Sequence, residues 1–152
     1  MKNPREEPSL VWLCLSTASA PDTVAMPLMM EPLILIVDDY QDAREMYAEY
    51  LKASGFRVAE ARTGIEAVAK ARELGPDCIL MDLSLPGIDG WEATRQIKAD
   101  QKTTGIPVVA ITGHASELAS RDAKAAGCTS FVLKPALPDA VVAEVRKALT
   151  VV

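Results

Sequence analysis

Short apolar segments alternate with helical segments five times through most of the chain, and this alternation limits the fold more than any other feature. Four of the apolar segments are almost continuously hydrophobic: Leu33–Val37, Cys78–Met81, Val108–Ile111 and Phe131–Leu133. Strands have this character when helices bury both faces of a sheet. The fifth segment, Arg57–Ala61, alternates in polarity, which is typical of a half-exposed edge strand.

The segments between the predicted strands carry start and stop signals for helices. We expect helices at 42–54, 64–74, 90–99, 116–126 and 137–149. Thr63 and Glu66 form a capping box at the start of the second helix, and Pro138 lies in the first turn of the last, where its missing N–H is tolerated. Five βα units with short connections predict an α/β fold, in which a doubly wound parallel sheet is covered by helices on both faces.

Residues 1–31 differ from the rest of the chain. They contain four of the ten prolines and four of the six methionines, and they show no hydrophobic period. We interpret 1–31 as a disordered extension, or as the result of translation from a start upstream of the natural one, and 32–150 as the single domain. A secretory leader is disfavoured, because acidic residues cancel the basic ones and the apolar run is short.

Composition narrows the class of ligand and the compartment. The formal net charge is −5 without a cluster of Lys and Arg, so we expect no direct binding to nucleic acid. No apolar run approaches the ~18–20 residues of a membrane-spanning helix, and we expect no membrane partner. The three cysteines form no Cys-x-x-Cys pair and do not indicate a disulfide framework, and reduced thiols fit the cytoplasm.

Polar residues follow the predicted strands at the points where those strands end. Asp38 and Asp39 follow the first strand, Asp82 the third, Thr112 the fourth and Lys134 the fifth. In open parallel sheets, ligands bind beyond the carboxyl ends of the strands. The fold therefore brings these five side chains together although they are far apart in the sequence.

This set of side chains suits the formation of an aspartyl phosphate. Two carboxylates ~4 Å apart repel each other by about 4 kcal/mol at an effective dielectric of ~20. A hard divalent cation relieves this repulsion, and Mg²⁺ suits a site with few carboxylates because it keeps several waters and binds phosphate oxygens. Lys134 supplies a positive charge and Thr112 a hydroxyl group. A carboxylate nucleophile, a metal, a lysine and a hydroxyl can together form and hold an aspartyl phosphate.

Four motifs occur in a fixed order along the chain: Ile34-Leu-Ile-Val-Asp38-Asp39, Ile79-Leu-Met-Asp82-Leu-Ser-Leu-Pro86-Gly87-Ile-Asp89-Gly90, Val109-Ala-Ile-Thr112-Gly, and Ala126-Gly127 through Phe131-Val-Leu-Lys134-Pro135. With these motifs and their spacing, the sequence from about Leu33 to Leu149 resembles the receiver domain of two-component response regulators. The resemblance implies a flavodoxin-like (βα)5 sandwich whose five parallel strands take the order 2-1-3-4-5.

The resemblance also implies a role for each matching residue. Asp82 would be the phosphorylated residue. Mg²⁺ or Mn²⁺ would be held by Asp38, Asp39, Asp82 and the backbone carbonyl of Ser84. Lys134 would contact the phosphoryl group, next to a cis peptide bond to Pro135. The loop after the phosphorylated strand would turn at Pro86 and Gly87.

The switch and the partners follow from the same resemblance. Thr112 would swing toward the phosphate and Phe131 would turn inward with it, which changes the surface around the fifth strand and its flanking helices. The phosphodonor would be a histidine kinase or a histidine phosphotransfer protein, and the signal would be read by an unknown downstream protein. Because the chain ends soon after the last predicted helix, we expect no output domain and no enzyme activity beyond self-phosphorylation and self-dephosphorylation of Asp82.

Three other functions fit parts of the pattern less well. A haloacid-dehalogenase-like phosphatase needs a second aspartate two residues after its nucleophile, where this chain has Ser84. A flavodoxin-like cofactor carrier needs a Ser/Thr/Gly-rich phosphate loop after the first strand, where this chain has the acidic segment 38–42. A receiver-like module that is not phosphorylated has no support, because every acidic position is filled.

Overall fold

A five-stranded parallel sheet forms the centre of the domain, for which the computed structural model describes residues 31–113 and 125–150. The strands are β1 (Leu33–Val37), β2 (Arg57–Ala61), β3 (Cys78–Asp82), β4 (Val108–Thr112) and β5 (Ser130–Leu133). They take the order β2-β1-β3-β4-β5, and every neighbouring pair is parallel. The predicted α/β fold and the strand order 2-1-3-4-5 are therefore confirmed.

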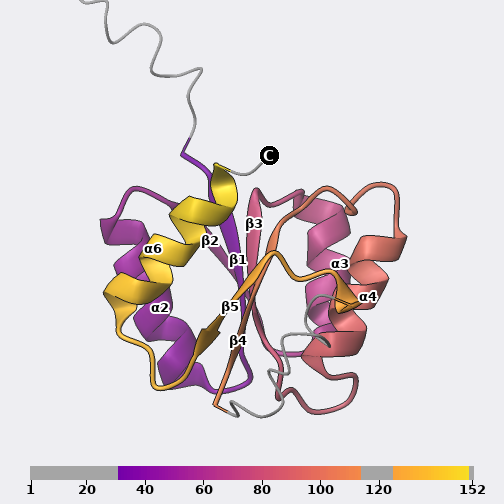
Figure 1. The fold of residues 1–152 in the computed structure, drawn as a ribbon, viewed down its shortest axis with the longest axis horizontal. Coiled ribbons are helices and arrows are strands. Elements are labelled where there is room, and N and C mark those ends of the chain that lie inside the picture. Colours follow the sequence, from indigo (N-terminus) through magenta and orange to yellow (C-terminus); the bar gives the residue numbers. More distant parts are fainter. Residues whose placement is uncertain (1–30, 114–124, 151–152) are drawn as a thin grey trace, which may run out of the picture. The chain divides into compact units, whose positions relative to one another are not determined.

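Helices cover the sheet on both faces. They are α2 (Gln41–Ala53), α3 (Gly64–Leu74), α4 (Gly90–Ala99) and α6 (Pro138–Leu149). Figure 1 shows α2 and α6 on one side of the sheet and α3 and α4 on the other. Each pair of helices buries its own hydrophobic cluster against the strands, the first including Leu51 and Val145 and the second Ala67 and Ile97. In the described part of the chain, no helix is long and apolar enough to span a bilayer.

Two strands extend one residue beyond their predicted carboxyl ends, and these residues are polar. Asp82 ends β3 and Thr112 ends β4. Both still pair in the ladder, Asp82 with Ile111 and Thr112 with Leu133, because strand pairing uses the backbone and does not require an apolar side chain. Two polar side chains are thereby fixed at the edge of the sheet where parallel strands end.

The prediction that β5 is buried on both faces is wrong. Only Val132 of its four residues is buried, because among the described strands β5 lies at the edge of the sheet and pairs with β4 alone. The strand β2 at the other edge is half-exposed, as predicted. Most of the helix expected at 116–126 lies outside the described residues. The division between residues 1–31 and 32–150 stays a prediction.

Candidate functional site

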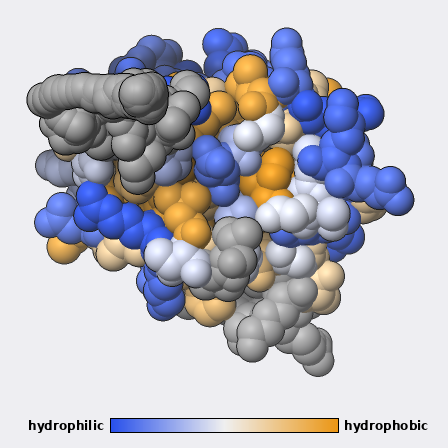
Figure 2. All heavy atoms as spheres, turned by 90° about the horizontal axis from the view of Figure 1, so that it is seen from above, coloured by the Kyte–Doolittle hydropathy of each residue, from blue (hydrophilic) through white to orange (hydrophobic). Residues whose placement is uncertain are grey.

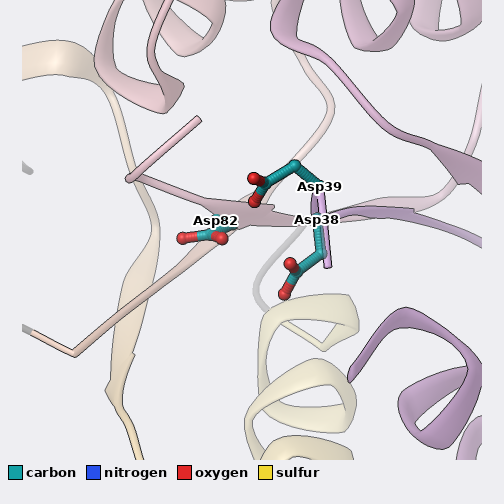
Figure 3. Close-up of side chains that lie close together, drawn as sticks. All are labelled: Asp38, Asp39 and Asp82. Carbon is teal, nitrogen blue, oxygen red and sulfur yellow. The ribbon is translucent and has the colours of Figure 1, made fainter. Parts of the chain in front are cut away.

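Three aspartates meet at the carboxyl ends of β1 and β3, which are neighbouring strands (Figure 3). Asp38 and Asp39 directly follow β1, and Asp82 is the last residue of β3. One carboxylate oxygen from each lies within 4.8 Å of the others. Asp38 and Asp82 are 1% and 4% exposed, whereas Asp39 faces solvent. The structure thus brings together three carboxylates that the strand pattern placed at one rim.

Asp38 is fixed by two contacts to its carboxylate and one to its backbone N–H. Its Oδ1 accepts a hydrogen bond from the backbone N–H of Tyr40, the residue before α2, at 2.9 Å. Its Oδ2 accepts a hydrogen bond from Lys134 Nζ at 3.3 Å. The backbone N–H of Asp38 donates to the carbonyl of Ala61 on β2 at 3.1 Å. Asp38 therefore has little freedom to reorient.

Lys134 brings positive charge to the aspartates from the end of β5. Its backbone N–H donates to the carbonyl of Thr112 at 2.7 Å, and its peptide bond to Pro135 is cis. Its Nζ lies 3.3 Å from Asp38 Oδ2 and 3.5 Å from Asp82 Oδ2. Burial lowers the pKa of Lys134, but the carboxylates of Asp82 and Asp38 together outweigh burial and raise that pKa above its usual value. The ammonium group is therefore charged at neutral pH.

Asp82 carries a net electrostatic penalty. Burial raises the pKa of its carboxyl group, and the carboxylates of Asp38 and Asp39 raise it further. The backbone N–H of Ser84, which donates to Asp82 Oδ1 at 3.0 Å, and the nearby Lys134 both lower this pKa without cancelling the rise. Burial and the neighbouring carboxylates therefore make the charged form of Asp82 less favourable than it is in water.

The other predicted residues lie around these charges. Thr112 is fully buried at the end of β4. Gly87 has a φ of 77°, in the left-handed region that favours glycine, and forms the turn after β3 together with Pro86. Phe131 lies on β5, and its side chain is 40% exposed. The expected inward turn of Phe131 stays a prediction.

Two glycines allow parts of the backbone to approach each other closely near Asp82, and neither was predicted from the sequence. A Cβ on Gly90, the first residue of α4, would lie 2.2 Å from the carbonyl oxygen of Asp82. A Cβ on Gly64, the first residue of α3, would lie 2.6 Å from the carbonyl oxygen of Ile88, in the loop after β3. The sequence did contain a signal for Gly90. Asp89 caps α4 with its side chain, so a glycine at the next position is not needed for capping and must have another cause.

The donor set fits a hard divalent cation. Carboxylate oxygens are the side-chain ligands that Mg²⁺ and Mn²⁺ prefer. Three carboxylates with one lysine leave an excess of negative charge that a cation would neutralise. The site also has a buried carboxylate in Asp82 beside the positive charge of Lys134, and phosphoryl transfer to a carboxylate requires groups of these two kinds.

Comparison with known proteins identifies the family. A model of the response regulator receiver domain matches residues 34–146. Because this match covers most of the chain, the protein belongs to the response regulator receiver domain family. It is a receiver domain of two-component systems, and the acidic pocket of Asp38, Asp39 and Asp82 fits the phosphoacceptor site. The resemblance inferred from the motifs is confirmed.

Individual relatives agree with this assignment. The polar-differentiation response regulator DivK of Brucella ovis is 35% identical over 106 residues, which are 70% of this chain and 86% of that protein. The chemotaxis response regulator CheY4 of Vibrio cholerae superposes with a TM-score of 0.73 at 27% identity, over 78% of this chain and 98% of that one.

A third relative carries a metal. The receiver domain of the sensor histidine kinase PA1611 of Pseudomonas aeruginosa has a TM-score of 0.73 at 29% identity, over 79% of this chain and 98% of that one. That structure contains a magnesium ion coordinated in the active site cleft.

Proposed function

We propose that Asp82 accepts a phosphoryl group from a phosphohistidine on a histidine kinase or a histidine phosphotransfer protein. The observation that supports this most directly is the position of Asp82 beside two further carboxylates and the Lys134 ammonium group, within a receiver domain. The other strand-end carboxylates, Asp38 and Asp39, are ligands in this proposal.

The transfer step replaces one bond to phosphorus with another. A carboxylate oxygen of Asp82 attacks phosphorus and forms an O–P bond, the P–N bond to the donor imidazole breaks, and the imidazole nitrogen takes up a proton. Lys134 Nζ, 3.5 Å from Asp82 Oδ2, would stabilise the negative charge on the phosphoryl oxygens. Mg²⁺ or Mn²⁺, held by Asp38, Asp39, Asp82 and the backbone carbonyl of Ser84, would supply further positive charge there.

The signal would leave the site through Thr112 and β5. The backbone N–H of Lys134 donates a hydrogen bond to the carbonyl of Thr112. A shift of Thr112 toward the phosphoryl group would therefore displace the end of β5, the strand on which Phe131 is exposed. A downstream protein would read the changed surface. We place this exchange in the cytoplasm, and the only chemistry we assign to the domain is phosphorylation and dephosphorylation of Asp82.

Phosphorylation by a small donor tests the proposal. Incubation with acetyl phosphate and Mg²⁺ should add the mass of one phosphoryl group to the wild type, and Asp82→Asn should show no gain. Asp77→Asn, which changes the aspartate just before β3, is the matched control and should gain mass like the wild type. Release of inorganic phosphate would reveal a short-lived phosphoprotein. The proposal fails if neither mass gain nor phosphate release depends on Asp82.

A further inference from the structure

Arg44 on α2 is the one buried lysine or arginine among the residues that the structure describes. Only 7% of its surface is exposed. Burial of a guanidinium group is unfavourable unless the charge is paired and its donors are used. The contacts of Arg44 therefore indicate what its burial achieves.

Arg44 connects the end of β1 to β2. Its Nη1 donates a hydrogen bond to the backbone carbonyl of Asp38 at 2.9 Å, and its Nε donates to Oε1 of Glu60 at 2.8 Å. A guanidinium group is a rigid fork, so the bond to Glu60 sets the direction in which Nη1 points. Glu60 lies in β2 opposite Ile36 of β1, which anchors the fork in the sheet itself.

The bond from Arg44 completes the fixation of the Asp38 backbone. The N–H of Asp38 continues the ladder by donating to Ala61, and the carbonyl of Asp38 is held by Arg44. Because a peptide bond is planar, fixing the Asp38 carbonyl also fixes the N–H of Asp39. The side chain of Asp39 therefore leaves the backbone in a direction that depends on Arg44, toward the other two aspartates (Figure 3).

We propose that Arg44 is a positioning residue of the metal site, which holds the backbone of Asp38 and Asp39 so that both carboxylates can bind one divalent cation. This inference rests on the proposed function, in which these two aspartates are metal ligands. Arg44 acts through the backbone that carries the ligands. Partners of metal ligands commonly influence affinity in this way.

A purely structural link between α2 and β2 would give a different result. Both roles predict that loss of Arg44 lowers the stability of the fold, because Glu60 and the Asp38 carbonyl lose their partner. Only the positioning role predicts weaker Mg²⁺ binding by molecules that remain folded. The test therefore measures Mg²⁺ affinity on folded protein.

Calorimetric titration with Mg²⁺ of the wild type, Arg44→Lys and Arg44→Gln provides that measurement. Lysine keeps the charge but lacks the fork, and we expect both variants to raise the Kd for Mg²⁺ roughly tenfold or more. Arg72→Lys is the matched control, because Arg72 Nε pairs with Asp100 at the same 2.8 Å but lies in the last turn of α3. We expect Arg72→Lys to leave the Kd unchanged.

The rate of phosphorylation by acetyl phosphate gives a second readout. In the Arg44 variants, the Mg²⁺ concentration that gives half the maximal rate should rise with the Kd, while the rate at saturating Mg²⁺ stays within about twofold of the wild type, because Arg44 does not touch the reacting atoms. If Arg44→Gln does not fold, Glu60→Ala, which removes the anchor and keeps Arg44, replaces it.

Two results separate this inference from the proposed function. A wild-type Kd for Mg²⁺ in folded Arg44→Lys and Glu60→Ala would overturn the positioning role and leave the proposed function intact. A wild type that neither binds Mg²⁺ nor becomes phosphorylated would overturn the proposed function and this inference with it.

Discussion

The carboxylates at the two ends of the parallel sheet differ in how fully their negative charge is matched by partners. At the end where the strands begin, carboxylates have close partners: Asp77 accepts the N–H of Leu33 at 2.8 Å, and Asp100 pairs with Arg72 at 2.8 Å. At the end where β1 and β3 stop, three carboxylates lie within 4.8 Å of one another, and the Lys134 ammonium group is 3.3 and 3.5 Å from two of them.

Cations also differ between the two ends. Lys98, at the end where the strands begin, donates to the backbone carbonyls of Ile106 and Thr104 at 2.6 and 3.1 Å. Figure 2 views this end, with hydrophilic residues around its rim and hydrophobic residues between them. Lys134 at the other end faces only carboxylates through its Nζ in the contacts of the described residues. One lysine closes backbone hydrogen bonds, and the other partly offsets an excess of negative charge.

The difference teaches that unmatched negative charge is concentrated in the three aspartates at the strand ends, whereas the carboxylates at the strand starts have partners, as Glu60 has in Arg44 near the strand ends. Matched charges near the strand starts stabilise the fold without a ligand. Unmatched charges at the strand ends raise the free energy of the unliganded protein and leave binding energy for a cation and a phosphoryl group. Substitutions at the two ends should therefore give opposite patterns of stability and activity.

The largest contrast is expected between the two lysines. Lys134→Met should lower the rate of phosphorylation by acetyl phosphate roughly 10²–10³-fold, because the phosphoryl oxygens lose their stabilising charge. Lys98→Met should leave that rate unchanged but lower the free energy of unfolding by about 1–2 kcal/mol, because two carbonyls lose their donor. Mass spectrometry over time and urea unfolding measure the two effects. Equal losses of rate in both variants would remove the contrast.

The next largest contrast is expected between two glycine-to-alanine substitutions and their effects on the free energy of unfolding. Gly90→Ala should lower the free energy of unfolding by about 2–3 kcal/mol, because its Cβ would lie 2.2 Å from the Asp82 carbonyl oxygen and no side-chain movement relieves this. Gly105 lies in the connection before β4, and a Cβ there would meet no atom within 4 Å, so Gly105→Ala should have almost no effect. Thermal unfolding followed by circular dichroism measures both. A wild-type Tm for Gly90→Ala would mean that the Asp82 strand can shift.

Mg²⁺ should stabilise the protein only by binding to the aspartates at the strand ends. At a Mg²⁺ concentration ten times the Kd, the free energy of unfolding should rise by about 1.4 kcal/mol. Asp39→Asn should lose most of this gain because it removes a proposed ligand, whereas Asp100→Asn should keep it. Thermal unfolding with EDTA and with Mg²⁺ separates the two. An Asp39 variant that gains as much as the wild type would exclude Asp39 as a ligand.

Patterns along the chain predicted most of the fold and the charged part of the site. The bounds of β1, β2, α3 and α4 match the predicted ranges, because apolar runs and capping residues are local signals. Thr63 caps α3 as predicted, with its Oγ1 accepting the N–H of Glu66. The carboxylates could be placed because parallel strands end at the same edge of a sheet, so the residue after each apolar run belongs to one rim.

Features that depend on contacts between distant elements could not be predicted. Arg44 looks like a solvated helix residue in the sequence, and its burial follows from the positions of Glu60 and the Asp38 carbonyl. The close approach of Gly90 to Asp82 depends on how α4 meets β3. The exposure of β5 follows from its place at the edge of the sheet. Its apolar sequence does not reveal this place, because it looks like that of a central strand.

The smallest expected contrast is between Asp77, just before β3, and Asp82, the last residue of β3. The two substitutions should change the free energy of unfolding in opposite directions. In EDTA near pH 7.5, Asp82→Asn should raise the free energy of unfolding by on the order of 1 kcal/mol, because it removes a carboxylate that burial and neighbouring charges destabilise. Asp77→Asn should lower it by about 0.5–1 kcal/mol, because it weakens a charge-assisted hydrogen bond to Leu33.

The pH dependence identifies the cause of the Asp82 effect. Burial, with the carboxylates of Asp38 and Asp39, raises the pKa of Asp82 in the folded state, so between the unfolded pKa of about 3.9 and the higher folded value the native state binds more protons. The wild type therefore loses stability relative to Asp82→Asn as pH rises through this window, and the two should converge below about pH 4. Urea unfolding at several pH values checks the sign. If Asp82→Asn were the less stable protein at pH 7.5, the attraction of Lys134 would outweigh burial and repulsion, and the two ends of the sheet would not differ in the way proposed.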